Sequence, residues 1–279
     1  MRTLDVSTIV DHIARMCVDA NYYVEDALMR SLKKAQNDET SELGKNILGQ
    51  IIENDEIAAN THAPMCQDTG FVVAFIEIGT ELQLIGDLED AVNEGVRRGY
   101  DKGYLRKSVV KHPLDRINTK DNTPAIVHYN LTAGDQLKIT IAAKGAGSEN
   151  QSQLQMLKPA DGYDGVKQVV IDTVLKAGGN PCPPIIVGVG IGGSFEKCAL
   201  IAKEALMRPL DDVSNDEIAA KLEEELLAEI NELNVGPMGF GGKTTALAVK
   251  VNTYPCHIAA LPVAVNIQCH ASRHLTKVF

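Results

Sequence analysis

The chain has 279 residues, 44% of them hydrophobic, and a formal net charge of -10, which together exclude a disordered protein and allow a large buried core. No apolar run reaches the about 18 residues of a membrane span, the first twenty residues lack the apolar core of an export signal, and no dense basic run favours nucleic acid. We therefore expect a cytoplasmic globular protein with no membrane or nucleic-acid partner, whose six cysteines stay as thiols.

The first predicted region is a helical lobe over residues 1–63. Residues 6–34 and 40–60 repeat apolar side chains at helical spacing, so both stretches are expected to be helical. Cys17 lies on the apolar stripe of the first stretch, which favours a packed thiol over a ligand.

Residues 64–279 are predicted to form a mixed part around a central sheet, which makes the fold class α/β. Apolar runs and alternating patterns predict strands at residues 71–78, 125–131, 136–143, 184–189, 246–251 and 258–267. Helical spacing predicts helices at residues 88–102, 166–177, 195–207 and 215–233. No internal repeat or low-complexity linker is visible, so we expect a single domain over residues 1–279, with His270 and His274 in an exposed C-terminal segment.

Two glycine-rich runs are similar to nucleotide-binding motifs. The run from Gly188 to Gly193 fits G-x-G-x-x-G between a predicted strand and a predicted helix, but no second strand ending in an acidic residue follows it, so a dinucleotide site is only a minor alternative. The run Gly241-Gly242-Lys243-Thr244 has Pro237 where a P-loop requires glycine, and it is interpreted as a turn.

Three cysteines stand out because of where they lie. Cys66 and Cys269 are in polar, non-periodic segments, and Cys198 follows the glycine turn before a predicted helix. Three thiolates from distant segments would leave one iron of a four-iron cluster without a protein ligand and open to a substrate oxygen. Cys182 lies between prolines beside a predicted strand and is interpreted as packed, whereas Cys256 is ambiguous. Spacing alone does not decide between a three-thiol site and structural thiols.

Five motifs, in one order along the chain, resemble the class I, iron-sulfur fumarate hydratases. They are Met65-Cys66-Gln67-Asp68-Thr69-Gly70, Lys144-Gly145-Ala146-Gly147-Ser148-Glu149-Asn150, Gly192-Gly193-Ser194-Phe195-Glu196-Lys197-Cys198, Gly239-Phe240-Gly241-Gly242-Lys243 and Pro262-Val263-Ala264-Val265-Asn266-Ile267-Gln268-Cys269. The resemblance runs from Val6 to the C-terminus and indicates the alpha subunit of the two-subunit form. It implies a [4Fe-4S] cluster held by Cys66, Cys198 and Cys269, a separate beta subunit and an α2β2 assembly.

The same resemblance implies which residues meet a small dicarboxylate. A second set of contacts is expected from the beta subunit. Asp68 and His257 are expected to transfer protons, or else to orient their neighbours. Arg106 offers the planar guanidinium fork that suits a carboxylate. The expected substrate contacts of this chain are Gln67, Asp68, Arg106, Gly145, Gly147, Ser148 and His257.

The implied reaction is the reversible hydration of fumarate to L-malate. The alternatives are the alpha subunit of an L-tartrate dehydratase, which shares the plan and the cluster, and a non-catalytic cluster-binding subunit. The chain alone is expected to bind a cluster but to have little or no activity without its beta partner.

Overall fold

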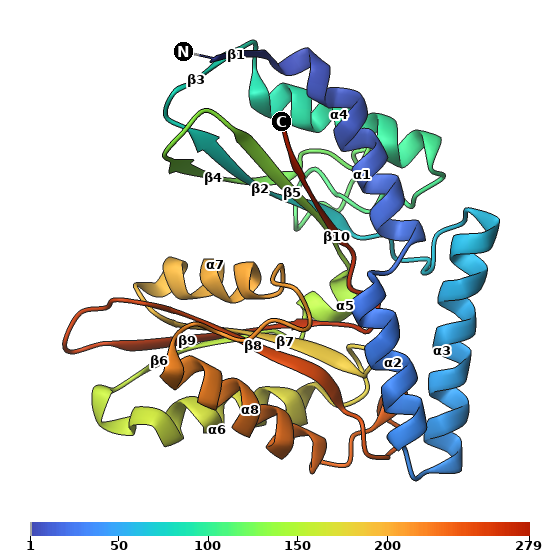
Figure 1. Cartoon of the computed structure of the whole chain (residues 1–279), viewed down its shortest axis with the longest axis vertical. Helices are drawn as coiled ribbons and strands as arrows, with labels where there is room; N and C mark the ends of the chain where they lie inside the picture. Colours follow the sequence, from blue (N-terminus) through green and yellow to red (C-terminus); the bar gives the residue numbers. More distant parts are fainter. Residues whose placement is uncertain (1) are drawn as a thin grey trace. The chain divides into compact units, whose positions relative to one another are not determined.

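The computed structural model describes residues 2–279 and divides them into two compact units. Unit 1 contains the chain up to Val24, Asn54–Ala146 and Arg273–Phe279, and unit 2 contains Glu25–Glu53 and Gly147–Ser272. Helices and strands occur in both units, which confirms the predicted α/β class (Figure 1). Within the described residues, no helix has both the length and the apolar character needed to cross a bilayer.

A four-stranded sheet in the order β10-β5-β2-β4 organises unit 1. The central strands β2 (Phe71–Gly79) and β5 (Leu137–Lys144) pair antiparallel and carry most of the buried apolar side chains of the sheet. On the flanks, β10 (His274–Val278) runs antiparallel to β5, and β4 (Ile126–Thr132) runs parallel to β2. A separate parallel pair joins β1 (Arg2–Asp5) to β3 (Leu82–Ile85).

Two helices pack together in unit 1. They are α1 (Val10–Tyr22), which follows the short η1 (Val6–Ile9), and α4 (Leu88–Lys102), and they lie side by side in Figure 1. Gly95 of α4 permits their close approach, because a Cβ there would lie 2.6 Å from the Ile13 Cβ. The Asp87 carboxylate begins α4 by accepting the Asp90 amide (3.0 Å), as an N-cap does.

A second four-stranded sheet, in the order β6-β9-β7-β8, forms the centre of unit 2. Its strands are β6 (Gln153–Leu157), β7 (Ile185–Gly192), β8 (Ala246–Tyr254) and β9 (Leu261–Gln268), and only β7 and β8 pair in parallel. One face is covered by α7 (Phe195–Ala205), and the other by α6 (Gly162–Ala177) and α8 (Glu217–Asn231) (Figure 1). The short elements are α5 (Ala146–Glu149), η2 (Pro159–Asp161) and η3 (Pro237–Gly239).

The predicted helical region at the start of the chain is shared between the units. Helix α1 ends at Tyr22, residues 23–25 are not helical, and α2 (Asp26–Asp38) follows in unit 2. Helix α3 (Glu42–Thr61) begins in unit 2 and enters unit 1 at Asn54. Helical spacing predicted these helices but carried no information on which core each would join.

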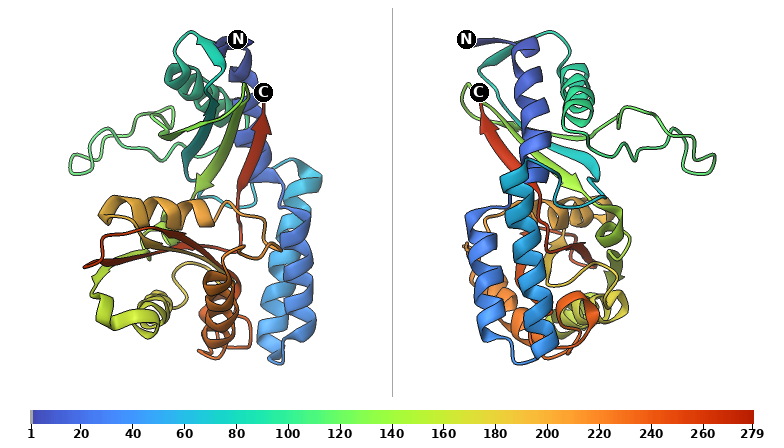
Figure 2. Two further views of the ribbon diagram at one scale, coloured as in Figure 1. Left: turned by 60° about the vertical axis from the view of Figure 1, so that its left-hand side comes forward. Right: turned by 90° about the vertical axis from the view of Figure 1, so that its right-hand side faces the viewer.

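The segment between α4 and β4, residues 103–125, forms a long loop that projects from the rest of unit 1 (Figure 2). Its base is fixed by Asn122, whose buried side chain accepts the Ser108 amide (2.7 Å) and donates to the Gly70 carbonyl (3.2 Å). This segment carries Arg106, one of the predicted substrate contacts.

The C-terminal segment differs from its prediction. His274 is buried and begins β10, so the expectation that it is exposed is wrong. The signal was weak because β10 is short and only its first residue is buried, and its partner β5 lies more than a hundred residues away in the sequence.

Candidate functional site

Residues 65–70, which lead into β2, are held from both ends in unit 1. The Met65 amide donates to the Asn21 carbonyl (3.0 Å), and its carbonyl accepts the Asn54 amide group (2.9 Å). At the other end, the buried Tyr100 hydroxyl donates to the carbonyls of Thr69 (2.7 Å) and Gly70 (3.1 Å). Burial raises the pKa of Tyr100, so the phenol stays protonated as a donor. The segment that carries Cys66, Gln67 and Asp68 therefore has a fixed backbone.

The Asp68 carboxylate is half-buried and oriented by two main-chain amides. Its Oδ1 accepts the Gly70 amide (3.1 Å), and its Oδ2 accepts the Ala146 amide (2.9 Å). The second bond brings the predicted turn at Gly145 to this carboxylate, since a Cβ on Gly145 would lie 3.2 Å from Asp68 Oδ2. A charged acceptor bound to two amides is held in one orientation.

Arg106 is joined to the same loop through its backbone. The Thr69 hydroxyl donates to the Arg106 carbonyl (3.1 Å), while the guanidinium itself is exposed. Gln67 is also exposed. Unit 1 thus brings together four of the predicted substrate contacts: Gln67, Asp68, Arg106 and Gly145.

The remaining predicted contacts belong to unit 2. Gly147 and Ser148 lie in α5, with Gly147 exposed and Ser148 buried. His257 lies in the exposed turn between β8 and β9, where its Nδ1 accepts the Ala259 amide (3.1 Å). An acceptor at Nδ1 places the proton of the neutral imidazole on Nε2.

The three predicted cluster thiols are divided between the units. Cys66 is half-buried in unit 1, and Cys198 and Cys269 are in unit 2. Cys198 is fully buried between α7 and the sheet, packs with Ala264 of β9 and donates its Sγ hydrogen to the Phe195 carbonyl (3.3 Å). Burial raises the pKa of this thiol.

Strand geometry separates Cys198 from Cys269. Cys198 packs beside Ala264 of β9, and Cys269 follows five residues later, directly after β9 ends, a path of roughly 16 Å at the rise of a strand. Cys182 is a closer neighbour of Cys269, because the amide of the next residue, His270, donates to the Cys182 carbonyl (3.4 Å). Both thiols of this second pair are half-buried, so they are accessible from the surface.

Sequence reasoning passed over Cys182 because it stands between prolines beside a buried strand. Cys182 could have been selected as a candidate ligand by the criterion that selected Cys66 and Cys269, which is a position in a non-periodic segment. Cys182 adopts the left-handed backbone region (φ 56°), unlike a residue of a packed helix or strand.

The half-buried cysteines supply the type of donor that an iron-sulfur cluster requires. Within unit 2, Cys182 and Cys269 lie on neighbouring backbone segments, and within unit 1, Cys66 lies on a loop with a fixed backbone. Thiolates are the usual ligands of iron-sulfur clusters. In the described part of the chain, no three His, Cys, Asp or Glu side chains form a metal site together.

The dinucleotide-like glycines have a packing role. A Cβ on Gly188 would lie 2.2 Å from the Ala202 carbonyl oxygen, and one on Gly190 would lie 2.1 Å from that of Cys198. These two glycines sit in β7 directly under α7, so their small size lets the helix approach the strand.

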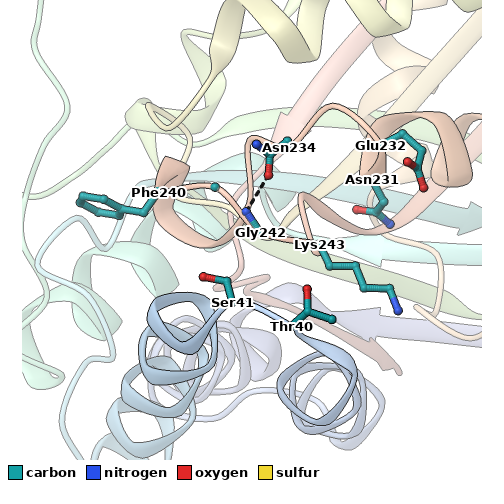
Figure 3. Close-up of a pocket in the computed structure, with 9 residues that line it drawn as sticks. Thr40, Ser41, Asn231, Glu232, Asn234, Phe240, Gly242 and Lys243 are labelled. Carbon is teal, nitrogen blue, oxygen red and sulfur yellow. Dashed lines mark hydrogen bonds between the residues drawn. The ribbon is translucent and has the colours of Figure 1, made fainter.

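The P-loop-like run binds a carboxylate of its own chain. Glu39, at the end of α2, accepts the amides of Lys243 (2.9 Å) and Thr244 (3.3 Å). The neighbouring Gly242 amide donates to Asn234 Oδ1 (3.0 Å), as Figure 3 shows beside the open polar pocket at this loop. These amides therefore stabilise the connection between α2 and the loop.

Comparisons with known proteins cover nearly the whole chain. The model of a family described as fumarate hydratase (Fumerase) matches residues 10–278. The chain is similar to a putative L(+)-tartrate dehydratase subunit alpha of Methanocaldococcus jannaschii, with 42% identity over 276 residues that cover 96% of each chain. It is also similar to the L(+)-tartrate dehydratase subunit alpha of Escherichia coli K12, with 30% identity over 275 residues that cover 97% of this chain and 90% of the relative.

Proposed function

Because the chain belongs to the fumarate hydratase (Fumerase) family of hydro-lyases, we propose that it is the alpha subunit of an enzyme that interconverts fumarate and L-malate together with a separate beta subunit. The observation that carries this proposal is the arrangement of residues 65–70. They present an oriented carboxylate at Asp68 and anchor the segment of Arg106. A dicarboxylate substrate needs such a cation and such a proton-transferring group.

Arg106 is proposed to bind one substrate carboxylate. Its guanidinium is exposed, while the Thr69 hydroxyl fixes its carbonyl, so the side chain starts from a defined point and can form two parallel hydrogen bonds to a carboxylate. Gln67 and the segment Gly145–Ser148 are proposed to orient the rest of the substrate.

Asp68 and His257 are proposed to deliver the proton with which the leaving hydroxyl departs as water, and to take a proton from water in the reverse reaction. Asp68 keeps lone pairs for a substrate or water proton after accepting two amides, and His257 presents a proton on Nε2. Asp68→Asn retains the shape of the side chain and removes its basicity. We expect this change to lower kcat by about a hundredfold or more with a smaller effect on KM. An unchanged kcat would exclude the role.

The cofactor is proposed to be a [4Fe-4S] cluster held by Cys66, Cys182 and Cys269. Cys182 replaces Cys198 in this proposal because it adjoins Cys269, whereas Cys198 is buried on α7. When bound, a cluster with one iron lacking a protein ligand supplies Lewis acidity for the departure of a hydroxyl group.

Four serine substitutions test the ligand set after anaerobic reconstitution with iron and sulfide. We expect Cys66→Ser, Cys182→Ser and Cys269→Ser to lose the visible absorption of the cluster. Cys198→Ser is the matched control, and it is expected to retain that absorption. If Cys198→Ser loses the cluster absorption and Cys182→Ser retains it, the ligands are instead Cys66, Cys198 and Cys269, as the family resemblance implies.

L(+)-tartrate is the second candidate substrate, and the names of the relatives favour it. The reconstituted chain and beta subunit should be assayed with L-malate, fumarate and L(+)-tartrate at equal concentrations. Higher kcat/KM for L-malate and fumarate supports the first candidate, whereas higher kcat/KM for L(+)-tartrate reverses the order. A loaded complex that converts none of them would favour a non-catalytic cluster-binding subunit.

A further inference from the structure

A buried arginine lies behind the Asp68 carboxylate. Arg273 precedes β10, is only 3% exposed and has its backbone fixed by the Ala143 amide, which donates to its carbonyl (2.9 Å). Its Nη1 donates to the Asp68 carbonyl and to Asn21 Oδ1 (3.2 Å). All of these residues belong to unit 1.

The guanidinium also faces the turn that binds the carboxylate. A Cβ on Gly145 would lie 3.0 Å from Arg273 Nη2 and 3.2 Å from Asp68 Oδ2, so the cation and the carboxylate border the same small space. Arg273 Nε is buried and has no hydrogen-bond partner within residues 2–279. A buried positive charge is costly unless a negative charge lies close to it, and Asp68 supplies that charge.

Arg273 and Asn21 together hold both ends of the segment from Met65 to Asp68. The Asn21 carbonyl accepts the Met65 amide (3.0 Å), and Asn21 Oδ1 accepts Arg273, which in turn binds the Asp68 carbonyl. Asn21 is itself fixed, because its side-chain amide donates to the Cys17 carbonyl of α1 (2.9 Å). The backbone around Cys66 and Gln67 is thus fixed at both ends by hydrogen bonds to the buried residues Asn21 and Arg273.

We propose that Arg273 is a positioning residue. Its guanidinium binds the Asp68 carbonyl and places a positive charge near the Asp68 carboxylate, and so it holds this carboxylate in the orientation needed for proton transfer. The predicted effect of Arg273 on turnover rests on the proposed function. Its effect on the structure of the loop is independent of that function.

Arg273→Lys keeps the positive charge but removes the planar guanidinium whose Nη1 donates to both the Asp68 carbonyl and Asn21 Oδ1. In the complex with the beta subunit, we expect kcat to fall about 10- to 100-fold, KM to change less than about threefold, and the cluster to be retained. In the Asp68→Asn background, the same change should lower kcat by less than about twofold, because the two residues act as one unit. Equal effects in both backgrounds, or an unchanged kcat, would overturn the proposal.

Amide hydrogen exchange tests the proposal without turnover. The amides of Gly70 and Ala146 are bonded to the Asp68 carboxylate, so Arg273→Lys should increase exchange in peptides that contain them. Arg208→Lys is the matched control, because Arg208 is a half-buried arginine of unit 2 that binds Asp212 and Glu223. Unchanged exchange at Gly70 and Ala146 in Arg273→Lys would refute the positioning role even if the enzyme proved to be inactive.

Asn21→Ser provides a second variant if Arg273→Lys does not fold. It leaves the arginine in place and removes the acceptor that orients it. Faster exchange at Gly70 and Ala146 would support the proposal, and wild-type exchange would contradict it.

Discussion

At the scale of single residues, the chain buries charged groups for different purposes. Arg273 and Asp68 lie together beside the predicted substrate contacts, whereas Asp55 of α3 is 2% exposed and its Oδ2 has no partner within residues 2–279. Burial raises the pKa of Asp55 to about 6, and the hydrogen bond from Asn54 only partly opposes this shift. An isolated buried carboxylate is a cost to stability rather than a support.

The sign of that cost gives a pH-dependent prediction for Asp55. Its folded pKa exceeds the unfolded value of about 3.9, so the folded state binds the proton more tightly and loses stability as pH rises through this interval. Asp55→Asn should therefore raise the free energy of unfolding by about 1–3 kcal/mol at pH 8 and by less at pH 5. Urea unfolding at both pH values measures this difference. The exposed Asp172 of α6 serves as a control, and Asp172→Asn should leave stability nearly unchanged at either pH.

Residue types in the sequence identified part of the site and missed the rest for a physical reason. The run that contains Cys66 and Asp68 was recognisable from its composition, and the structure shows that its backbone is fixed and its carboxylate is oriented. Cys182 and Arg273 were not selected, because their importance depends on neighbours more than fifty residues away in the sequence. Local pattern contains no information on such pairs.

At the scale of elements, long apolar runs and helical periods were reliable. Helix α4 was predicted over residues 88–102 and occupies Leu88–Lys102, because its spacing and its Asp87 cap agree. Strands β1, β3 and β6 were missed, since each is short and has few fully buried side chains to produce a pattern. Strand β7 extends past its prediction to Gly192, because its glycines pack under α7 instead of ending the strand.

The end of α2 carries a stabilising contact with the loop at residues 242–244 in unit 2. Burial raises the pKa of Glu39, but bonds from the amides of Ser41, Lys243, Thr40 and Thr244 outweigh burial and lower it overall. The resulting stabilisation is present above the unfolded pKa of about 4.3 and is lost as pH falls through the lower folded value.

Removing the Glu39 charge should weaken this contact. We expect Glu39→Gln to lower the free energy of unfolding by about 1–3 kcal/mol at pH 7, since the amides of Lys243 and Thr244 lose a charged acceptor. Thermal or urea unfolding measures the loss. Glu42→Gln is the control, because its side chain is 90% exposed and should matter little. Equal stability of the two variants would show that the contact contributes nothing.

At the scale of the whole molecule, the predicted substrate contacts of this chain contain a single permanent cation, Arg106. A dicarboxylate has two negative groups, so full binding is expected to require further cations from the beta subunit. We predict that the isolated chain has little or no turnover and that co-purification with the beta subunit gives an α2β2 assembly. Light scattering and activity of the same fractions test both statements. Full turnover by the isolated cluster-loaded chain would contradict the first, and a simple αβ pair would contradict the second.

The packing of Gly188 and Gly190 against α7 also affects how motif matches in such chains should be interpreted. A search for the dinucleotide fingerprint would retrieve this sequence, although two of its glycines are explained by the 2.2 Å and 2.1 Å approaches of helix carbonyls. Any relative that keeps the tight helix-on-strand approach is under pressure to keep these glycines, whatever it binds. Fingerprint hits in this family therefore report on interior geometry and should not be counted as cofactor assignments.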